Sequence, residues 1–148
     1  IVKVRHRGGD EETFSSKSTG ILSGLPLAVI IDKETASSGE LLAGALREGA
    51  GAQLIGQKTF GKGTIQNLED LPNHYAFKYT VSVFLLPSGQ PIEGNGLTPD
   101  VDVALPIPEQ SNYERQLSRL QHMQNATDRI AADAQLRAAV NVARLQIH

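Results

Sequence analysis

Ser37 and Lys62 are the two residues of this chain whose types and surroundings best suit chemistry. Ser37 stands where an apolar, strand-like run gives way to a helix-like one, and Lys62 lies between two glycines, two residues after Phe60. A serine hydroxyl is a poor nucleophile until a base removes its proton, and a neutral lysine amine is one such base. The pair therefore predicts a hydrolase that uses serine and lysine.

A lysine base must be neutral at the working pH, whereas a free lysine side chain has a pKa of about 10.4. Burial in an apolar site without a carboxylate lowers that pKa. Phe60 is an apolar neighbour of Lys62, and no acidic residue lies within five positions of it. In an extended segment alternate side chains share a face, so Lys62, Thr64 and Gln66 are expected to point the same way. Gln66 would then orient the lysine amine without adding a charge.

The residues that follow Ser37 predict a helix. Ser37 and Glu40 have the offset of a capping box, apolar residues recur at helical spacing over 41–46, and Gly-Ala-Gly at 49–51 is expected to end the helix. Backbone N–H groups at a helix start lack partners and can stabilise a developing oxyanion. The backbone N–H of Ser38 is the expected donor.

Each of these residues also has an explanation that involves no chemistry. A serine at a helix start is most often a structural cap, a lysine between glycines commonly lies in a solvated turn, and Gln66 is a polar residue on a strand. The spacing of Gly56, Gly61 and Lys62 is close to that of a phosphate-binding P-loop, which needs Ser or Thr directly after the lysine and then a helix. Gly63 takes that place and strand-like residues follow, which disfavours a nucleotide site.

The elements that must position these residues alternate between strand and helix patterns. The apolar run 27–31 predicts a central strand that is buried on both faces. Two strand-like runs within residues 1–15 predict a hairpin that covers one edge of a sheet. Further strands are expected over 52–55, 64–68 and 75–86. The pattern indicates an α/β body.

The C-terminal part of the chain has a different character. From Asn112 onward apolar residues recur at helical spacing, and Asp133 is the expected N-cap of a helix. We expect a pair of helices that packs on the α/β body or extends from it, after a proline-containing linker over 104–110.

Composition excludes several classes of protein. The chain has 148 residues, which is the size of one domain. Its net charge is −2 and its basic residues are scattered, so no nucleic-acid partner is expected. Cysteine is absent, which excludes disulfides, thiolate metal ligands and a catalytic thiol. The four histidines have no metal-ligand spacing, and neither a metal nor a cofactor is expected.

Four blocks of residues follow one another in an order that a known family shares. Residues 35–46 read Thr-Ala-Ser-Ser-Gly-Glu-Leu-Leu-Ala-Gly-Ala-Leu, and residues 56–66 read Gly-Gln-Lys-Thr-Phe-Gly-Lys-Gly-Thr-Ile-Gln. Thr80 with Pro-Ser-Gly at 87–89, and then Gly-Leu-Thr-Pro-Asp at 96–100, come further along. These blocks resemble the motifs of the C-terminal processing peptidases, also called tail-specific proteases, and the resemblance covers residues 1 to 103.

The resemblance implies both a fold and an activity. The fold is a partial crotonase/ClpP-like α/β core over residues 1–105, with a helical C-terminal extension over 106–148. The activity is that of a serine endopeptidase, which cleaves polypeptides near their C-terminal tails without a cofactor. Its catalytic residues would be Ser37 as nucleophile, Lys62 as general base and Gln66 as the residue that orients the base.

In the same family, the backbone N–H of Ser38 would supply one oxyanion-hole donor. Glu48 falls where some members carry a functional acidic residue, although it fits a solvated helix charge equally well. The family also has a PDZ domain and an earlier segment with a second oxyanion donor. We expect this chain to lack both, because it begins at Ile1 within a strand-like run, and we expect it to be inactive or nearly so by itself.

Further expectations concern partners, place and an alternative function. The partners are polypeptide substrates, the N-terminal part of the same protein and, through the C-terminal helices, a homo-oligomer. Bacterial members of the family usually act in the periplasm or cell envelope. The alternative is a non-catalytic crotonase-like relative that binds apolar ligands or peptides. The presence of Ser37, Lys62 and Gln66 together favours the peptidase.

Overall fold

The computed structural model describes residues 1–18, 20–104 and 122–147, which form a mixed α/β structure. Its larger sheet is antiparallel, in the order β2-β1-β6-β5, and its smaller sheet is parallel, in the order β3-β4-β7. The strands of the larger sheet are β1 (Val2–His6), β2 (Glu11–Phe14), β5 (Thr64–Leu71) and β6 (Tyr75–Leu85). Those of the smaller sheet are β3 (Ala28–Ile31), β4 (Gln53–Gly56) and β7 (Val101–Asp102). The predicted fold class is confirmed.

The predicted N-terminal hairpin is also confirmed. β1 and β2 pair antiparallel, and β1 then pairs with β6, which places β2 at one edge of the larger sheet. Val4 is the buried residue of β1, and its side chain faces inward while its neighbours point outward, as the alternation of a strand requires.

The strand expected at the centre of a sheet is an edge strand instead. Among the described strands β3 pairs only with β4, and Ile30 is 41% exposed whereas Ile31 is 1% exposed. Val29 and Ile31 face the apolar core, and Ile30 points to the other side of the sheet. A continuous apolar run indicates that both faces of a strand have apolar neighbours. It does not predict the order of the strands in the sheet, which depends on how the chain returns to the sheet.

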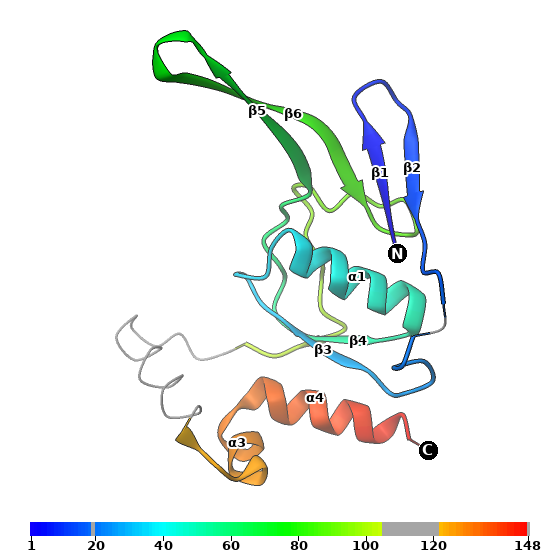
Figure 1. Ribbon diagram of the computed structural model, residues 1–148. Helices are drawn as coiled ribbons and strands as arrows, with labels where there is room; N and C mark the ends of the chain where they lie inside the picture. The colour runs from blue at the N-terminus through cyan, green and yellow to red at the C-terminus, as the bar shows by residue number, and fades with distance from the viewer. Residues whose placement is uncertain (19, 105–121, 148) are drawn as a thin grey trace.

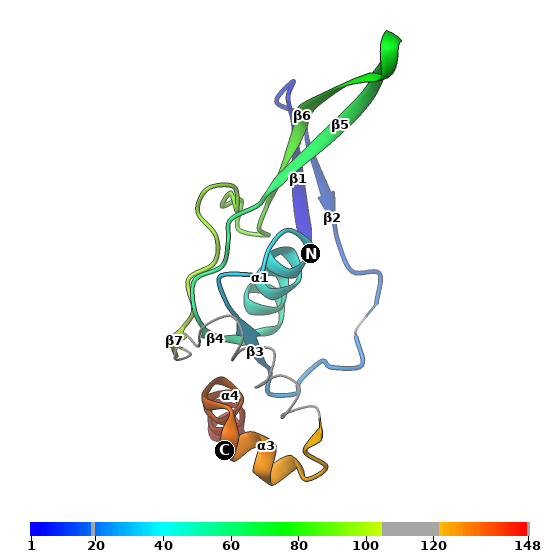
Figure 2. The ribbon, with the colours of Figure 1, turned by 90° about the vertical axis from the view of Figure 1, so that its left-hand side faces the viewer.

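Helix α1 (Ser38–Ala50) lies against one face of the parallel sheet, and α4 (Ala134–Leu145) lies on the opposite face (Figures 1 and 2). Its start and end agree with the sequence, since Ser37 is its N-cap and Gly51 ends it in the left-handed conformation. The core between α1, the parallel sheet and the following loops consists of Ile31, Ala43, Leu54, Leu86, Ile92 and Leu97.

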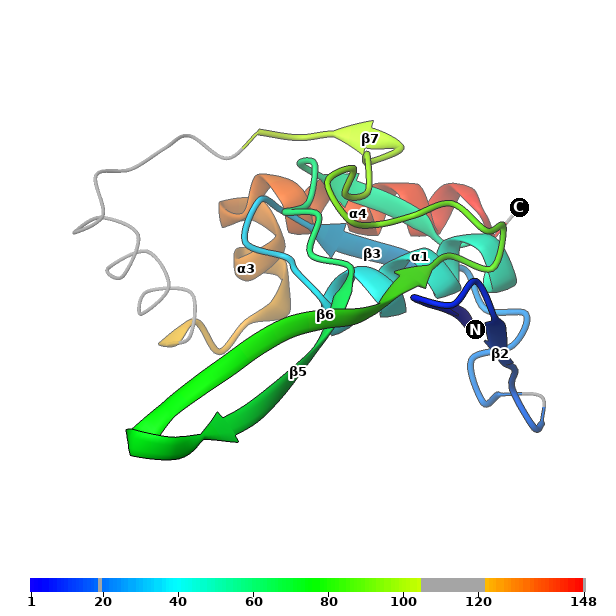
Figure 3. The same ribbon diagram turned by 90° about the horizontal axis from the view of Figure 1, so that it is seen from above.

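Strands β5 and β6 form a long hairpin that projects from this body, as the views from the side and from above show (Figures 1 and 3). A short 3-10 helix, η1 (Pro72–His74), closes its tip. The register shifts between Ile65 and Gln66, where β6 has one additional residue. Such a bulge bends and twists a ladder, and it lies where the hairpin leaves the body.

Two helices follow at the C-terminal end, α3 (Ala126–Ala132) and α4 (Ala134–Leu145). Asp133 is the N-cap of α4 and accepts a hydrogen bond from the backbone N–H of Leu136, as predicted. The buried Gln135 donates from Nε2 to the carbonyl of Val103, which ties α4 to the body.

Most of the expected linker and the residues 112–121 lie outside the described ranges, and the boundary at 105 stays a prediction. No helix within those ranges is long and apolar enough to cross a membrane.

A substitution at Gly56, at the end of β4, tests how closely the backbones of the parallel strands approach each other. Gly56 has a φ of 125°, and a Cβ placed on it would lie 2.1 Å from the carbonyl oxygen of Ile31. We expect Gly56→Ala to lower the free energy of unfolding by about 3 kcal/mol, because backbone must shift and the φ is unfavourable. Gly49→Ala, in open space within α1, should be neutral or stabilising. Urea unfolding of both variants measures the difference, and equal values would contradict this explanation.

Candidate functional site

The segment between β3 and α1 is a tight turn that delivers Ser37 to the start of the helix. The Oδ1 atom of Asp32 accepts hydrogen bonds from the backbone N–H of Glu34 and from both the N–H and the hydroxyl of Thr35, at 2.9 to 3.0 Å. An aspartate that binds the backbone two and three residues onward is a common way to fix a turn. Ser37 is therefore presented from a stiff support.

Ser37 itself has an unusual backbone. Its φ is 55° and its ψ is −118°, a combination that an L-residue other than glycine rarely adopts. Such a conformation costs on the order of 1–3 kcal/mol, and it persists only where the surrounding structure enforces it. The Ser37 side chain is half-buried at the junction of strand and helix.

Glu40 joins the Ser37 turn to the segment that carries Lys62. Its side chain is completely buried. One carboxylate oxygen, Oε2, accepts from the backbone N–H of Ser37 and from that of Lys62, each at 2.9 Å. The other, Oε1, accepts from the backbone N–H of Gly61 at 2.8 Å and from the hydroxyl of Thr59. Because one oxygen binds both N–H groups, the backbones of Ser37 and Lys62 are held side by side.

The loop from Thr59 to Lys62 is anchored at every residue to the segment around Ser37. Thr59, Gly61 and Lys62 donate to Glu40. Between them, the N–H of Phe60 donates to the carbonyl of Thr35 at 3.0 Å. Four consecutive residues are thus fixed against residues 35–40, and the loop has little freedom to move relative to the serine.

The glycines on either side of Lys62 permit a second close contact. A Cβ on Gly63 would lie 2.6 Å from the backbone nitrogen of Glu93, and a Cβ on Gly61 would lie 3.0 Å from that of Gly96. The carbonyl of Gly61 accepts from the N–H of Gly94 at 3.0 Å. Backbone therefore lies against backbone on both sides of Lys62, and the partner is the loop 92–97.

Lys62 is exposed and has no ion-pair partner within the described residues. The Lys62 side chain was expected to be buried beside Phe60, but Phe60 is itself 70% exposed and does not cover it. Glu40 and Glu93, which are distant in sequence, do lie beside the loop. Their carboxylates accept from backbone N–H groups, Glu93 from that of Gly63 at 2.6 Å. Both acids are therefore occupied by the main chain, and neither forms an ion pair with the Lys62 amine.

The remaining predicted site residues lie near this centre with fewer contacts. Ser38 is the first residue of α1, and in the described part of the chain its backbone N–H has no acceptor. Gln66 is exposed on β5 opposite Thr80. It shares a face with Thr64, but Lys62 precedes the strand, so the alternation does not extend to it. The orienting role of Gln66 and the oxyanion role of Ser38 stay predictions.

Sequence reasoning missed the function of Glu40 in joining the two segments. The capping-box offset correctly indicated its bond to the N–H of Ser37, but the pattern is local and says nothing of the loop 59–62. The available signal was the place of Glu40 three and four positions before Ala43 and Gly44, which puts an acidic side chain on the small-residue face of the helix. Glu48 accepts from the N–H and the hydroxyl of Ser88 at 2.7 and 2.8 Å, which connects α1 to the turn after β6.

Comparison with known proteins supports the resemblance of the sequence blocks. Residues 1–103 match Peptidase family S41. The carboxy-terminal-processing protease of Bartonella bacilliformis is 37% identical over 110 residues, which cover 74% of this chain and 25% of that protein. The carboxyl-terminal-processing protease of Picosynechococcus is 40% identical over 100 residues, which cover 68% and 24%. The chain spans about a quarter of the length of these relatives.

Solved structures agree with this similarity. The photosystem II D1 C-terminal processing protease matches 70% of this chain and 27% of its own, with a TM-score of 0.64 and 35% sequence identity. A lipoprotein from Streptococcus agalactiae matches 80% of this chain and 44% of its own, with a TM-score of 0.55 and 21% identity. The second likeness concerns the fold alone.

Replacing Glu40 by glutamine should separate the two halves of the site. An amide nitrogen in place of Oε2 removes the acceptor of the Ser37 and Lys62 N–H groups, and one in place of Oε1 removes that of the buried Gly61 N–H, while the Thr59 hydroxyl can turn to accept. Either placement should cost about 3 kcal/mol in unfolding free energy. The matched control is Glu48→Gln on the exposed part of the same helix, where we expect less than about 1 kcal/mol. Urea unfolding distinguishes them, and similar losses in both variants would refute the role assigned to Glu40.

The strain at Ser37 can be measured by a pair of substitutions. Ser37→Gly should be about 1 kcal/mol more stable than Ser37→Ala, since glycine adopts this φ without steric cost and loses only part of that gain to its greater freedom when unfolded. The neighbouring pair Ser38→Gly and Ser38→Ala should show the opposite order, because position 38 is helical. Thermal unfolding of the four variants provides the comparison. The same order at both positions would exclude backbone strain as the cause.

Proposed function

Since this chain belongs to peptidase family S41, we propose that it supplies the nucleophile and the general base of a serine endopeptidase that processes polypeptides near their C-terminal ends. The observation that carries the proposal is the strained backbone of Ser37 at a strand-to-helix turn, held beside the loop of Lys62 by one carboxylate. The α/β-hydrolases present a nucleophilic serine on a strained strand-to-helix turn, whereas an N-cap residue ordinarily has an unstrained extended backbone.

Lys62 is the proposed base. Its amine has no carboxylate partner in the described structure, so no ion pair has to be broken before it accepts the serine proton. Exposure to water opposes the neutral form of an amine, and exclusion of water favours it. A polypeptide bound over the Ser37 turn would cover the lysine, so the substrate itself would help to create the neutral base.

Ser38 and Gln66 have supporting roles in the proposal. The N–H of Ser38, which has no acceptor among the described residues, would donate to the oxyanion that forms when the Ser37 hydroxyl attacks a peptide carbonyl. Donors of this kind are worth on the order of 10²–10³ in kcat. Gln66 would orient the Lys62 amine by an uncharged hydrogen bond.

The wider expectations are proposals of the same standing. The matched residues make up about a quarter of the relatives named as carboxyl-terminal processing proteases, and a PDZ domain and a second oxyanion donor would come from the rest of such a protein. Bacterial relatives favour a place in the periplasm or cell envelope. The Ser37 and Lys62 assignments do not depend on either point.

Substitution in the full-length protein tests the assignment. Ser37→Ala and Lys62→Met should each lower kcat for cleavage of β-casein, an unfolded protein substrate, by at least about 10³-fold. The controls are Ser23→Ala, which changes an exposed serine before β3, and Lys58→Met, which changes an exposed lysine on the loop that carries Lys62. Both variants should keep wild-type rates. Cleavage is followed by gel electrophoresis and mass spectrometry. A Ser37→Ala protein that cleaves at the wild-type rate would reject the proposed function.

A further inference from the structure

Phe60 is a large apolar side chain that the fold leaves in water beside the proposed dyad. Phe60 is 70% exposed, while Thr59 and Gly61 on either side are buried. Single exposed apolar residues are common on protein surfaces, and exposure alone would carry no meaning. The position of Phe60, two residues before Lys62, is the reason to ask what the ring contacts in a complex.

The backbone of Phe60 is fixed against the Ser37 turn. Its N–H donates to the carbonyl of Thr35 at 3.0 Å, and the residues before and after it both donate to Oε1 of Glu40. Thr35 and Glu40 are two residues before and three residues after Ser37 in the chain. The base of the Phe60 side chain is therefore held at a constant place relative to the serine.

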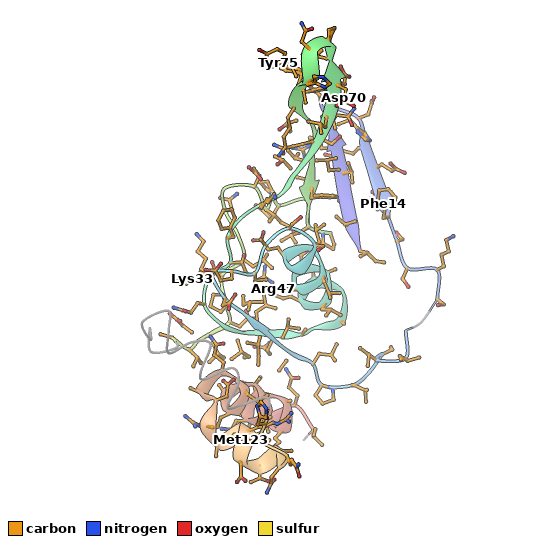
Figure 4. The ribbon with its side chains drawn as sticks, turned by 60° about the vertical axis from the view of Figure 1, so that its left-hand side comes forward. Phe14, Lys33, Arg47, Asp70, Tyr75 and Met123 are labelled. Atoms are coloured by element: carbon orange, nitrogen blue, oxygen red, sulfur yellow. The ribbon has the colours of Figure 1, made fainter. Side chains whose placement is uncertain are left out.

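Other exposed aromatic side chains lie elsewhere. Tyr75 and Phe77 belong to the β5–β6 hairpin and are 70% and 54% exposed. Figure 4 shows Tyr75 and Asp70 at the far tip of this hairpin, well away from Arg47 on α1. Among these aromatic residues, Phe60 is the one on the loop that carries Lys62 and is hydrogen-bonded to the Ser37 turn.

We infer that Phe60 determines specificity: its ring is the apolar surface against which a side chain of the bound polypeptide packs, next to the bond that Ser37 attacks. This inference rests on the proposed function and adds to it a preference for large apolar residues at that position. An aromatic ring on an immobile loop offers contact area with little entropy to lose. Polar and acidic side chains gain nothing from that surface and lose water.

The size of the preference follows from the area that the ring covers. Burying a leucine-sized side chain fully is worth about 1.5–3 kcal/mol. A single ring covers only one side of it, so truncation of Phe60 should cost about tenfold in kcat/KM for a substrate with leucine at that position. The loss should fall mainly on KM, because the contact is present before and during the reaction.

The experiment uses the full-length protein and β-casein as the probe. Mass spectrometry first maps the bonds that the wild type cleaves. Two peptides are then made from the strongest site, identical except for Leu or Ser at the residue next to the cleaved bond, and kcat/KM is measured for both. Phe60→Ala is compared with Phe60→Leu and with Phe77→Ala, the matched control on the distant hairpin. Thermal unfolding confirms that each variant is folded.

We expect Phe60→Ala to lose about tenfold on the Leu peptide and less than about twofold on the Ser peptide. Phe60→Leu should recover most of the selectivity, and Phe77→Ala should behave as the wild type. Equal effects of Phe60→Ala on the two peptides, with cleavage that still depends on Ser37, would reject the inference and leave the proposed function intact. Cleavage that survives Ser37→Ala would reject both.

Discussion

The buried carboxylate of Glu40 is the interaction on which the candidate site depends. A buried carboxylate is tolerated only when hydrogen bonds replace the water that it has lost. Here the replacements come from two segments, the Ser37 turn and the loop 59–62, which supply one and three donors. Neither segment alone satisfies the charge. The helix start and the lysine loop are therefore stable in this form only together, and the geometry of the site is a condition of folding rather than an addition to it.

The same carboxylate explains how an unfavourable backbone can persist. Ser37 is strained, yet its N–H is held by Glu40 and the preceding turn is held by Asp32. Strain is maintained where the surroundings determine the conformation from both sides. The lysine loop has a comparable double support, from Glu40 on one side and from the loop 92–97 on the other. Ser37 is still a helix cap and Lys62 is still exposed on a loop, but the shared carboxylate holds their backbones together, which neither sequence pattern requires.

Local pattern predicted most of the elements, because their signals are local. The hairpin at the N-terminus, the helix that begins after Ser37, and the cap at Asp133 each depend on residues a few positions apart. The prediction that β3 lies at the centre of its sheet was wrong, since an apolar pattern describes the two faces of a strand and not the strands that pair with it. The exposure of Lys62 and the approach of Glu93 could not be predicted either. Counting acids within five positions measures distance along the chain, whereas the carboxylates near the loop arrive from 22 and 31 residues away.

The hydrogen bonds to Glu40 close loops of 19 to 22 residues, and the chain between their ends consists of the rest of α1, the short strand β4 and the loops that flank it. The entropy lost in closing a loop grows slowly with its length, and contacts of modest sequence separation form early in folding. The serine and the lysine are thus built from one continuous stretch of chain. Such a stretch can bring Ser37 and Lys62 together before the antiparallel sheet is complete, and the loop 92–97 adds the second support of the lysine loop once it is in place. In evolutionary terms, the proposed nucleophile and the proposed base would be inherited as a unit.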